Sequence, residues 1–338
     1  MSTREVGVND SMTLPGTYEE FDDVRADSVG RPFIEVARNG IDLPLPGCGK
    51  TAERFDELRR QAKANSSVGR LYEAHADAIA ILHEADRSPQ PGKALAVWAS
   101  AGSKPLRLFG SHGKDRFVLD GRKSFCGGAS LVDAALVTAE SADGQQLVLI
   151  ELDQPGVGID DTVWKTPAFR DAGICTVEFL NIPVDPSRLI GPPNWYGSRT
   201  GFWHGAVGVA AVWAGIADAI AIQMSELLRH HDQLADVAIG EVEAAQWAVG
   251  ALLRAAASEI DARPLSAHAE TALSCRYAIH AHIERILQTF DQEVGPAGVV
   301  FNEELGTLRQ ELALSLAQSH GNRDLAVLAK IAAGNLKI

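Results

Sequence analysis

Hydrophobic and polar positions follow two different periods along the chain, and the period changes twice. Apolar residues recur every three to four positions over 17–87 and again from Phe202 to the end, which is typical of amphipathic helices. Between these regions Val, Ile, Phe and Thr alternate with polar residues, which favours strands. The order is therefore helical, then strand-rich, then helical. It lacks the βαβ alternation of a doubly wound or TIM-barrel protein.

Both helical regions contain start and stop signals. Thr51 is predicted to cap a helix, since Thr is a good N-cap residue. The segment Gly295–Gly298 is predicted to separate the last two helices. Long helices with short links are typical of an up-down four-helix bundle. The predicted helices span 17–39, 52–64, 67–87, 202–231, 234–262, 265–293 and 303–335.

The middle region predicts short strands separated by turns. Residues 116–126 read as a β-hairpin around Asp120-Gly121, because Asp-Gly is a strong two-residue hairpin signal. Residues 133–138 and 146–151 are predicted to pair across the turn 141–144. Further strands are expected over 94–100 and 175–180. This spacing favours one antiparallel barrel or sandwich.

The predicted fold class is therefore α+β with three regions. Residues 1–91 form an N-terminal helical domain, of which 1–16 are polar and expected to be disordered. Residues 92–190 form a middle antiparallel β domain, and residues 191–338 form a C-terminal four-helix bundle.

Composition excludes several classes of partner. Acidic residues number 44 and basic residues 31, so the net charge of −13 argues against nucleic acid and against an anionic membrane surface. No Cys-x-x-Cys pair occurs among Cys48, Cys126, Cys175 and Cys275, and no metal site is expected. The apolar run Gly205–Ile222 is expected to be a buried helix. The first residues contain no apolar leader, so a cytoplasmic location is predicted.

Several short motifs occur in a characteristic order. Gly121–Ala129 reads GRKSFCGGA, and Val132–Thr138 reads VDAALVT. Ala101-Gly102-Ser103 precedes them, and Trp164–Val177 (WKTPAFRDAGICTV) and Phe179–Val184 (FLNIPV) follow. Together with the order of helical and strand-rich regions, these motifs over residues 40–338 resemble the acyl-CoA dehydrogenase family of flavoproteins.

The resemblance implies an FAD-dependent oxidoreductase that desaturates an acyl thioester such as acyl-CoA. It also implies a homodimer or homotetramer formed through the C-terminal bundle, and an electron-transfer flavoprotein or a homologous subunit as a further partner. Trp98 is equally consistent with the flavin cradle and with the core of a strand. The expected flavin-binding residues are Trp98, Ser100, Gly102, Ser103, Phe125, Cys126 and Gly127.

The chain departs from the family at the positions that carry its chemistry. The family's catalytic Glu, which removes a proton from the substrate, falls on Ala332 or Ala333 here, and Ala cannot accept a proton. The family's Arg-x-x-Phe-Gly segment, which reaches a neighbouring subunit's FAD, is missing near Arg229. Gly127 stands where the family has a Ser or Thr beside the flavin.

Other residues are therefore considered for the chemistry. His320 lies in a polar break of the last helical region and resembles the His that the monooxygenase branch of this fold uses, and His204 is a second candidate. Arg199 is expected to bind substrate. Two alternatives to a dehydrogenase stay open: a flavin-dependent monooxygenase or oxidase, and a non-catalytic subunit of an active homologue. The segment Gly47–Thr51 superficially resembles a phosphate-binding loop, but position 44 is Pro and the helix-cap interpretation is favoured.

Overall fold

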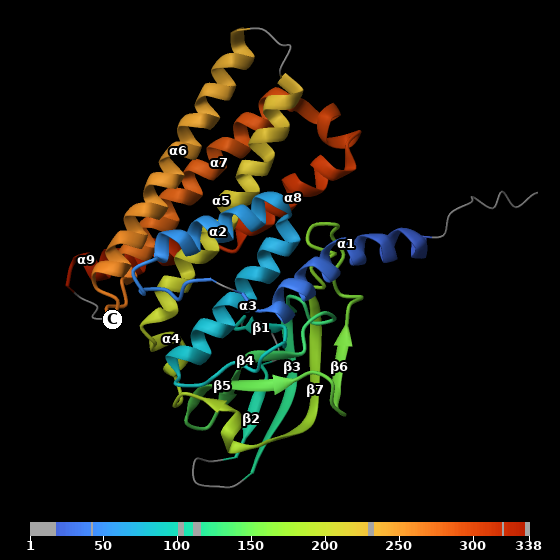
Figure 1. Ribbon diagram of the computed structural model, residues 1–338, viewed down its shortest axis with the longest axis vertical. Helices are drawn as coiled ribbons and strands as arrows, with labels where there is room; N and C mark the ends of the chain where they lie inside the picture. The colour runs from blue at the N-terminus through green and yellow to red at the C-terminus, as the bar shows by residue number, and fades with distance from the viewer. Residues whose placement is uncertain are drawn as a thin grey trace, which may run out of the picture.

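The computed structural model describes residues 18–41, 43–100, 105–110, 116–228, 233–319 and 321–334, with side chains from Val29 onward. Three helices precede the sheet: α1 (Tyr18–Asn39), α2 (Thr51–Ala64) and α3 (Ser66–Glu84). Figure 1 shows the sheet at one end of the molecule, a helical bundle at the other, and α3 between them. Helix α3 contacts both strand β1 and helix α5, so its side chains reach both halves.

The strands form one mixed sheet. In chain order they are β1 (Leu95–Trp98), β2 (Arg107–Phe109), β3 (Phe117–Cys126), β4 (Ala134–Ser141), β5 (Gly144–Glu151), β6 (Val157–Asp160), β7 (Cys175–Val184) and β8 (Leu189–Ile190). The spatial order is β6-β7-β3-β2-β4-β5-β8, and β1 pairs with β4. Most pairs are antiparallel, including the predicted β4–β5 hairpin. The pairs β1–β4 and β2–β4 are parallel, so the sheet is not purely antiparallel.

The predicted hairpin around Asp120-Gly121 is wrong. Strand β3 continues through both residues and pairs along its length with β7. Gly121 has a φ of +123° and marks a register shift between Leu119 and Gly121, which is the geometry of a β-bulge. The ten residues of β7 match both halves of β3, and this long-range pairing overrides the local turn signal.

The helices after the sheet form the bundle. They are α4 (Trp195–Ser198), α5 (Gly201–Leu228), α6 (Gln233–Ala262), α7 (Ala269–Val300), α8 (Glu303–Ala317) and α9 (Gly321–Ala332). Gly295 has non-helical φ and ψ inside α7, which confirms the predicted break. The predicted helix 303–335 is instead two helices, α8 and α9.

Helix α5 is the centre of the bundle. It is the one described helix that is long and apolar enough to cross a membrane, but 72% of its most apolar window is buried inside the molecule, as in a core helix. Small residues let α2 pack closely on it: a Cβ at Gly215 would lie 2.2 Å from the carbonyl oxygen of Arg59. Arg59 also forms two hydrogen bonds with Asp218 of α5, at 2.6 and 2.7 Å.

Thr51 does not cap α2 as predicted. It is the first helical residue, and its hydroxyl donates to Asp261 Oδ1 at 2.6 Å. The same carboxylate accepts the backbone N–H groups of Gly49 at 3.0 Å and Thr51 at 2.9 Å. The loop that resembles a phosphate-binding loop therefore holds an internal carboxylate from α6.

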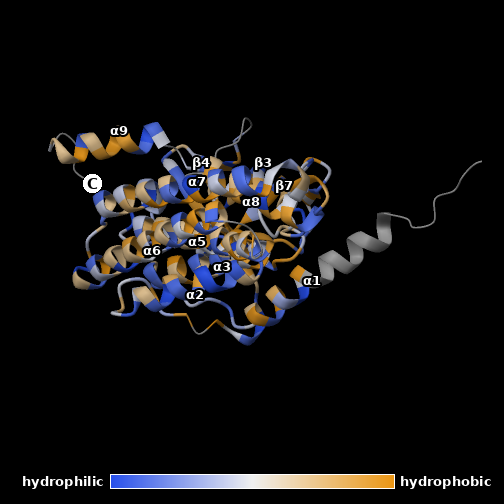
Figure 2. Cartoon of the chain, turned by 90° about the horizontal axis from the view of Figure 1, so that it is seen from above, coloured by the Kyte–Doolittle hydropathy of each residue, from blue (hydrophilic) through white to orange (hydrophobic). Residues whose placement is uncertain are grey.

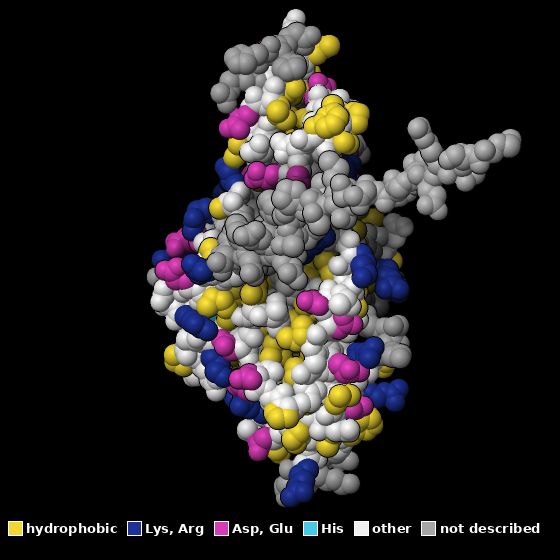
Figure 3. All heavy atoms as spheres, turned by 90° about the vertical axis from the view of Figure 1, so that its right-hand side faces the viewer, with side chains coloured by type: hydrophobic (Ala, Val, Ile, Leu, Met, Phe, Trp, Pro, Cys, Tyr) yellow, Lys and Arg dark blue, Asp and Glu magenta, His cyan; other side chains and the backbone are white. Residues whose placement is uncertain are grey.

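Two surface features concern charge and hydropathy. Basic and acidic side chains alternate over the face in Figure 3, so the negative net charge forms no single expanse there. Figure 2 shows α9 standing at the edge of the bundle, and none of its residues is buried. Homo-oligomerisation through the bundle stays a prediction.

Candidate functional site

The end of β3 presents an aromatic ring to open space. Phe125 has a φ of +59°, a left-handed conformation that is strained for a bulky residue, and its side chain is 63% exposed. Its ring meets Trp164 edge to face, with ring centroids 6.4 Å apart. A Cβ built on Gly127 would meet nothing within 4 Å. The strand end therefore leaves room for a planar ligand beside an aromatic ring.

The neighbouring Cys126 has the opposite orientation. Its side chain is fully buried and its thiol donates to the carbonyl oxygen of Lys123 at 3.1 Å. Burial raises the pKa of the Cys126 thiol to about 12, so the thiol stays protonated at neutral pH. Only the Cys126 backbone is available to a ligand at this strand end.

Trp98 of β1 and the nearby Ser100 hold the end of β3 in place by hydrogen bonds. Trp98 is 2% exposed, and its indole Nε1 donates to the carbonyl oxygen of Gly127 at 3.0 Å. Ser100 Oγ donates to the carbonyl oxygen of Ser124 at 2.6 Å. Trp98 is thus a core residue that also fixes the Gly127 turn, so the two interpretations open in the sequence are compatible.

The segment Trp164–Ile174 forms a second wall and links the sheet to the bundle. The N–H of Gly128 donates to Ala172 at 2.8 Å, which ties this segment to the β3–β4 turn. At its centre Phe169 is fully buried, with a φ of +55°. The Phe169 N–H donates to Glu311 Oε1 of α8 at 2.9 Å. Phe169 therefore lies between the strand end and the interior of the bundle.

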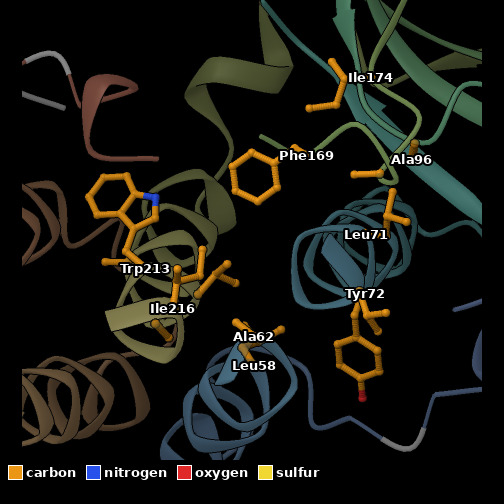
Figure 4. Close-up of a cluster of buried hydrophobic side chains, with 14 of the residues drawn as sticks. Leu58, Ala62, Leu71, Tyr72, Ala96, Phe169, Ile174, Trp213 and Ile216 are labelled. Carbon is orange, nitrogen blue, oxygen red and sulfur yellow. The ribbon is translucent and has the colours of Figure 1, made fainter. Parts of the chain in front are cut away.

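Beyond Phe169 lies a cluster of buried hydrophobic side chains from α2, α3 and α5. Figure 4 shows Trp213 of α5 and Phe169 in this cluster, with Leu71 and Tyr72 on the α3 side. The Arg70 guanidinium lies 5.1 Å from the centre of the Phe169 ring, and the Arg276 guanidinium lies 4.7 Å from the centre of the Trp213 ring.

Glu73 of α3 faces both guanidinium groups. Among the described residues its carboxyl group forms no hydrogen bond and no ion pair within 4 Å. Burial, and then the nearby Asp77, raise the pKa of Glu73 to about 8, although Arg54, Arg70 and Arg276 act against the shift. The Trp213 indole Nε1 is also buried without a hydrogen-bond partner. Glu73 and the Trp213 N–H thus have no hydrogen-bond partner among the described residues.

The sequence spacing of the charged residues on α3 indicates that they share one face of the helix. Arg70, Glu73 and Asp77 recur at intervals of three and four residues, so they share one face of α3. Charged residues on an inward face of an alanine-rich helix are uncommon and call for a partner. Arg276 and Trp213 carried no comparable local signal.

Arg199, the predicted substrate-binding residue, lies near the C-terminal end of α3. Its guanidinium is almost fully buried and contacts Glu84 at 2.9 Å and Asp77 at 3.6 Å. It also lies 5.5 Å from the centre of the Tyr196 ring. Two carboxylates already pair with Arg199, so its charge is committed within the protein, although its Nε lacks a partner.

His204 lies buried in the first turn of α5. Its Nε2 hydrogen-bonds the carbonyl oxygen of Ser266 at 2.9 Å, and its ring centroid is 5.6 Å from that of His268. Burial is the main cause that lowers the pKa of His204. These contacts join α5 to the α6–α7 connection, and no described hydrogen bond or ring contact joins His204 to the sheet. A chemical role for His204 stays a prediction.

Several predicted residues lie outside the described part of the chain: Gly102, Ser103 and His320. Ala332 and Ala333, where the family's catalytic Glu would align, are exposed at the end of α9. Within the described ranges, no group of three or more His, Cys, Asp or Glu residues could hold a metal ion.

Comparison with known proteins identifies the fold. No protein-family model matches the chain, and no curated protein matches it by sequence. Among solved structures, KijD3 in complex with FMN and a dTDP-amino-sugar is 17% identical, with a TM-score of 0.75, over 96% of this chain and 88% of that one.

Two further structures match at the same TM-score. Methanesulfinate monooxygenase MsuC from Pseudomonas fluorescens is 14% identical, with a TM-score of 0.75, over 95% of this chain and 98% of that one. Glutaryl-CoA dehydrogenase from Mycobacterium smegmatis is also 14% identical, with a TM-score of 0.75, over 95% of this chain and 96% of that one. The chain has an acyl-CoA dehydrogenase-like fold, which confirms the predicted fold class.

Proposed function

We propose that this chain is a flavin-dependent oxidoreductase whose flavin lies against Phe125 and Gly127. The observation that carries the proposal is an exposed aromatic ring beside a glycine with open space, held by hydrogen bonds from Trp98 and Ser100. A planar ring can pack on Phe125, and a residue without a side chain lets it approach the backbone closely. A bound flavin would supply the transfer of electrons between substrate and an acceptor.

Among flavin reactions, we favour an FMN-dependent monooxygenase over an acyl-thioester dehydrogenase. The dehydrogenase reaction needs a carboxylate base, and Ala332 and Ala333 stand at the position of the family's base. The Arg-x-x-Phe-Gly segment, which in the family reaches a neighbouring subunit's FAD, is also missing, which favours FMN. KijD3 with FMN and the monooxygenase MsuC have this fold, but so does glutaryl-CoA dehydrogenase, so the choice rests on the missing base.

The protein's own residues would then have distinct tasks. Phe125 and Trp164 would position the ring, and Trp98 would keep the Gly127 turn rigid from behind. Phe169, which is fully buried, would separate the ring from the interior of the bundle.

Flavin titration tests the binding site. Purified protein is titrated with FMN and with FAD, and binding is followed by flavin fluorescence. We expect Phe125→Ala to weaken FMN binding by about two- to tenfold, because one aromatic stacking contact contributes about 0.5–1.5 kcal/mol. Phe109→Ala is the matched control, since Phe109 of β2 is 51% exposed on the same sheet. Equal affinities for the two variants, or no flavin binding at all, would overturn the proposed site.

A second experiment separates the reaction classes. Reoxidation of protein-bound reduced FMN is followed with oxygen present, and bleaching of protein-bound oxidised flavin is followed anaerobically with a panel of acyl-CoA thioesters. A monooxygenase consumes oxygen only when reduced flavin is supplied. Anaerobic bleaching by a thioester would favour the dehydrogenase instead. A protein that binds no flavin would favour the non-catalytic subunit.

A further inference from the structure

A cavity lies between α1, the turn that joins α2 to α3, α5 and α8. Its volume is about 520 Å³, within the range of roughly 300–1,000 Å³ that is typical of small-molecule pockets. Figure 1 shows α1, α8 and the α2–α3 turn together on the right-hand side of the bundle. Phe125 and Gly127 do not line this cavity, so it is separate from the strand end where the flavin is proposed to lie.

Three buried polar residues line the cavity: Ser66 and Ser67 at the start of α3, and Glu311 of α8. The Ser66 hydroxyl donates to Glu311 Oε2, and the Phe169 N–H donates to Glu311 Oε1 at 2.9 Å. An ionised carboxylate accepts about four hydrogen bonds, so each oxygen of Glu311 can accept another. Ser67 is 5% exposed, and its hydroxyl forms no hydrogen bond among the described residues. Ser67 and Glu311 can therefore both accept from a donor inside the cavity.

The charges that line the cavity favour a cation. Asp171, Glu304 and Glu311 carry carboxylates, and Lys63 is the one basic residue among the described residues of the lining. Arg70 also acts on Glu311, but it does not line the cavity. Burial is the main cause that raises the pKa of Glu311, and a bound cation would favour the ionised carboxylate.

The rest of the lining favours an organic ligand over a bare metal ion. Apolar side chains of four helices line the cavity, among them Val29, Ala62, Ala219 and Leu305. A hard cation such as Ca²⁺ needs several oxygen ligands close together. Among the described residues, no group of three or more His, Cys, Asp or Glu could supply such a site. An organic cation can instead place its apolar part against these side chains and its charge against the carboxylates.

The cavity adjoins one wall of the proposed flavin site. Asp171 lines the cavity and belongs to the segment Trp164–Ile174. The ring of Trp164 meets the ring of Phe125, against which the flavin is proposed to lie. A ligand in the cavity would therefore contact the same segment that borders the flavin.

We propose that this cavity binds the ammonium group of an organic amine, with Glu311 and Ser67 as its acceptors and Asp171 and Glu304 nearer the surface. A protonated primary amine has N–H donors for both acceptors, and hydrogen bonds between ionised groups are stronger than neutral ones. The inference rests on the proposed function for the role of this amine as a substrate of the flavin reaction.

Ligand binding to the full chain tests the inference without turnover. The probes are cyclohexylmethylamine, cyclohexylmethanol and cyclohexanecarboxylate, which share one apolar ring and differ in charge. Calorimetry at pH 7 is expected to show binding of the amine. Binding of the alcohol is expected to be about tenfold weaker or more, because it lacks the charged hydrogen bond, and the carboxylate is expected not to bind.

Two variants test whether the amine binds in this cavity. Glu311→Gln removes a negative charge and is expected to weaken amine binding about tenfold or more. Ser67→Ala removes a hydroxyl without a partner among the described residues, so the fold should be unaffected while amine binding weakens about two- to tenfold. Glu293→Gln and Ser274→Ala on the exposed face of α7 are the matched controls, since neither residue lines the cavity. Circular dichroism checks that each variant is folded.

The outcomes separate this inference from the proposed function. FMN binding without amine binding would overturn the amine subsite and leave the flavin proposal intact. Amine binding that both cavity variants weaken, without FMN binding, would support the subsite and overturn the flavin proposal. Equal binding of the three probes, or wild-type affinity for the amine in both Glu311→Gln and Ser67→Ala, would contradict the inference.

Discussion

Helix α3 carries two sets of acidic residues that have opposite surroundings. Near its C-terminal end, Glu84 and Asp77 pair with the buried Arg199 at 2.9 and 3.6 Å. One turn before Asp77, Glu73 faces Arg70 and Arg276 without an ion pair to either among the described residues. One helix therefore carries carboxylates that form ion pairs with Arg199 and, one turn earlier, a carboxyl group that forms no ion pair among the described residues.

The difference separates charges that form ion pairs from charges that do not. An ion pair with a buried partner is costly to disrupt, since loss of one group leaves the other uncompensated. A charge that is shielded from water and has no direct partner instead reduces the stability of the fold.

The largest effect is expected at the paired end of the helix. Arg199→Ala is expected to lower the free energy of unfolding by about 2–3 kcal/mol, because it removes a buried guanidinium that donates to Glu84 and lies beside Asp77. Urea denaturation followed by circular dichroism measures the change. Arg122→Ala breaks only the exposed pair with Glu178 and is expected to cost under about 1 kcal/mol. Similar losses of stability in Arg199→Ala and Arg122→Ala would show that the buried guanidinium contributes no more than the exposed ion pair.

A change of the opposite sign in the free energy of unfolding is expected for a substitution in the middle of helix α3. Glu73→Leu is expected to raise the free energy of unfolding by about 1–2 kcal/mol, because it removes a half-buried carboxyl group that forms no hydrogen bond or ion pair among the described residues. The matched variant is Glu84→Leu, which is expected to destabilise the protein, since Glu84 accepts from Arg199 and from the Gly201 N–H. If both substitutions destabilise equally, Glu73 is a structural residue and the comparison fails.

Stability should also depend on pH through Glu73. The pKa of Glu73 is about 8 in the folded chain and 4.5 for an unperturbed glutamate, so the folded chain binds more protons between these values. The free energy of unfolding is therefore expected to decrease as pH rises from about 5 to 8. One proton gives at most about 1.4 kcal/mol per pH unit. Denaturation curves of the wild type and of Glu73→Gln measure the difference. Equal slopes in the two proteins would refute the assignment to Glu73.

The smallest effects compare two buried indoles. Trp98→Phe removes the hydrogen bond to Gly127 and leaves that carbonyl group without its partner, so a loss of about 1 kcal/mol is expected. Trp213→Phe removes an N–H group that has no partner, so the hydrogen-bond contribution to stability is expected to be unchanged. Thermal denaturation of both variants gives the comparison. An equal loss in Trp213→Phe would show that its N–H is satisfied after all.

Much of the fold followed from local patterns in the sequence. The helix periods placed α2, α3 and α5–α7 within a few residues, and the β4–β5 hairpin was correct. The Asp120-Gly121 hairpin failed because β7, more than 50 residues away, extends alongside both halves of β3. Thr51 failed as a cap because Asp261 of α6 takes its hydroxyl. Both errors arose where a distant segment competed with a local signal.

Some residues of the candidate site could be predicted from the sequence, and others could not. Phe125 and Gly127 could be identified from a contiguous motif, and the structure places them together at an open strand end. Arg199 was a reasonable candidate for binding an anionic substrate. A sequence shows that a residue is charged, but it does not show which residue pairs with it. The structure shows that Glu84 and Asp77 already pair with it, whereas Arg70 and Arg276 lack ion pairs among the described residues.

The sequence by itself determined the order of helices and strands, the motif at the end of β3 and the absence of the family's usual base at Ala332 and Ala333. These are local properties, set by side-chain periodicity and by residue identity. Only the tertiary structure decided which charges are paired, because α3, α5 and α7 bring together residues that are up to about 200 positions apart. Desolvation then depends on all neighbouring groups together. For this reason two residues that look like ordinary charges in the sequence differ in the folded chain: Arg199 pairs with Glu84, and Glu73 forms no ion pair among the described residues.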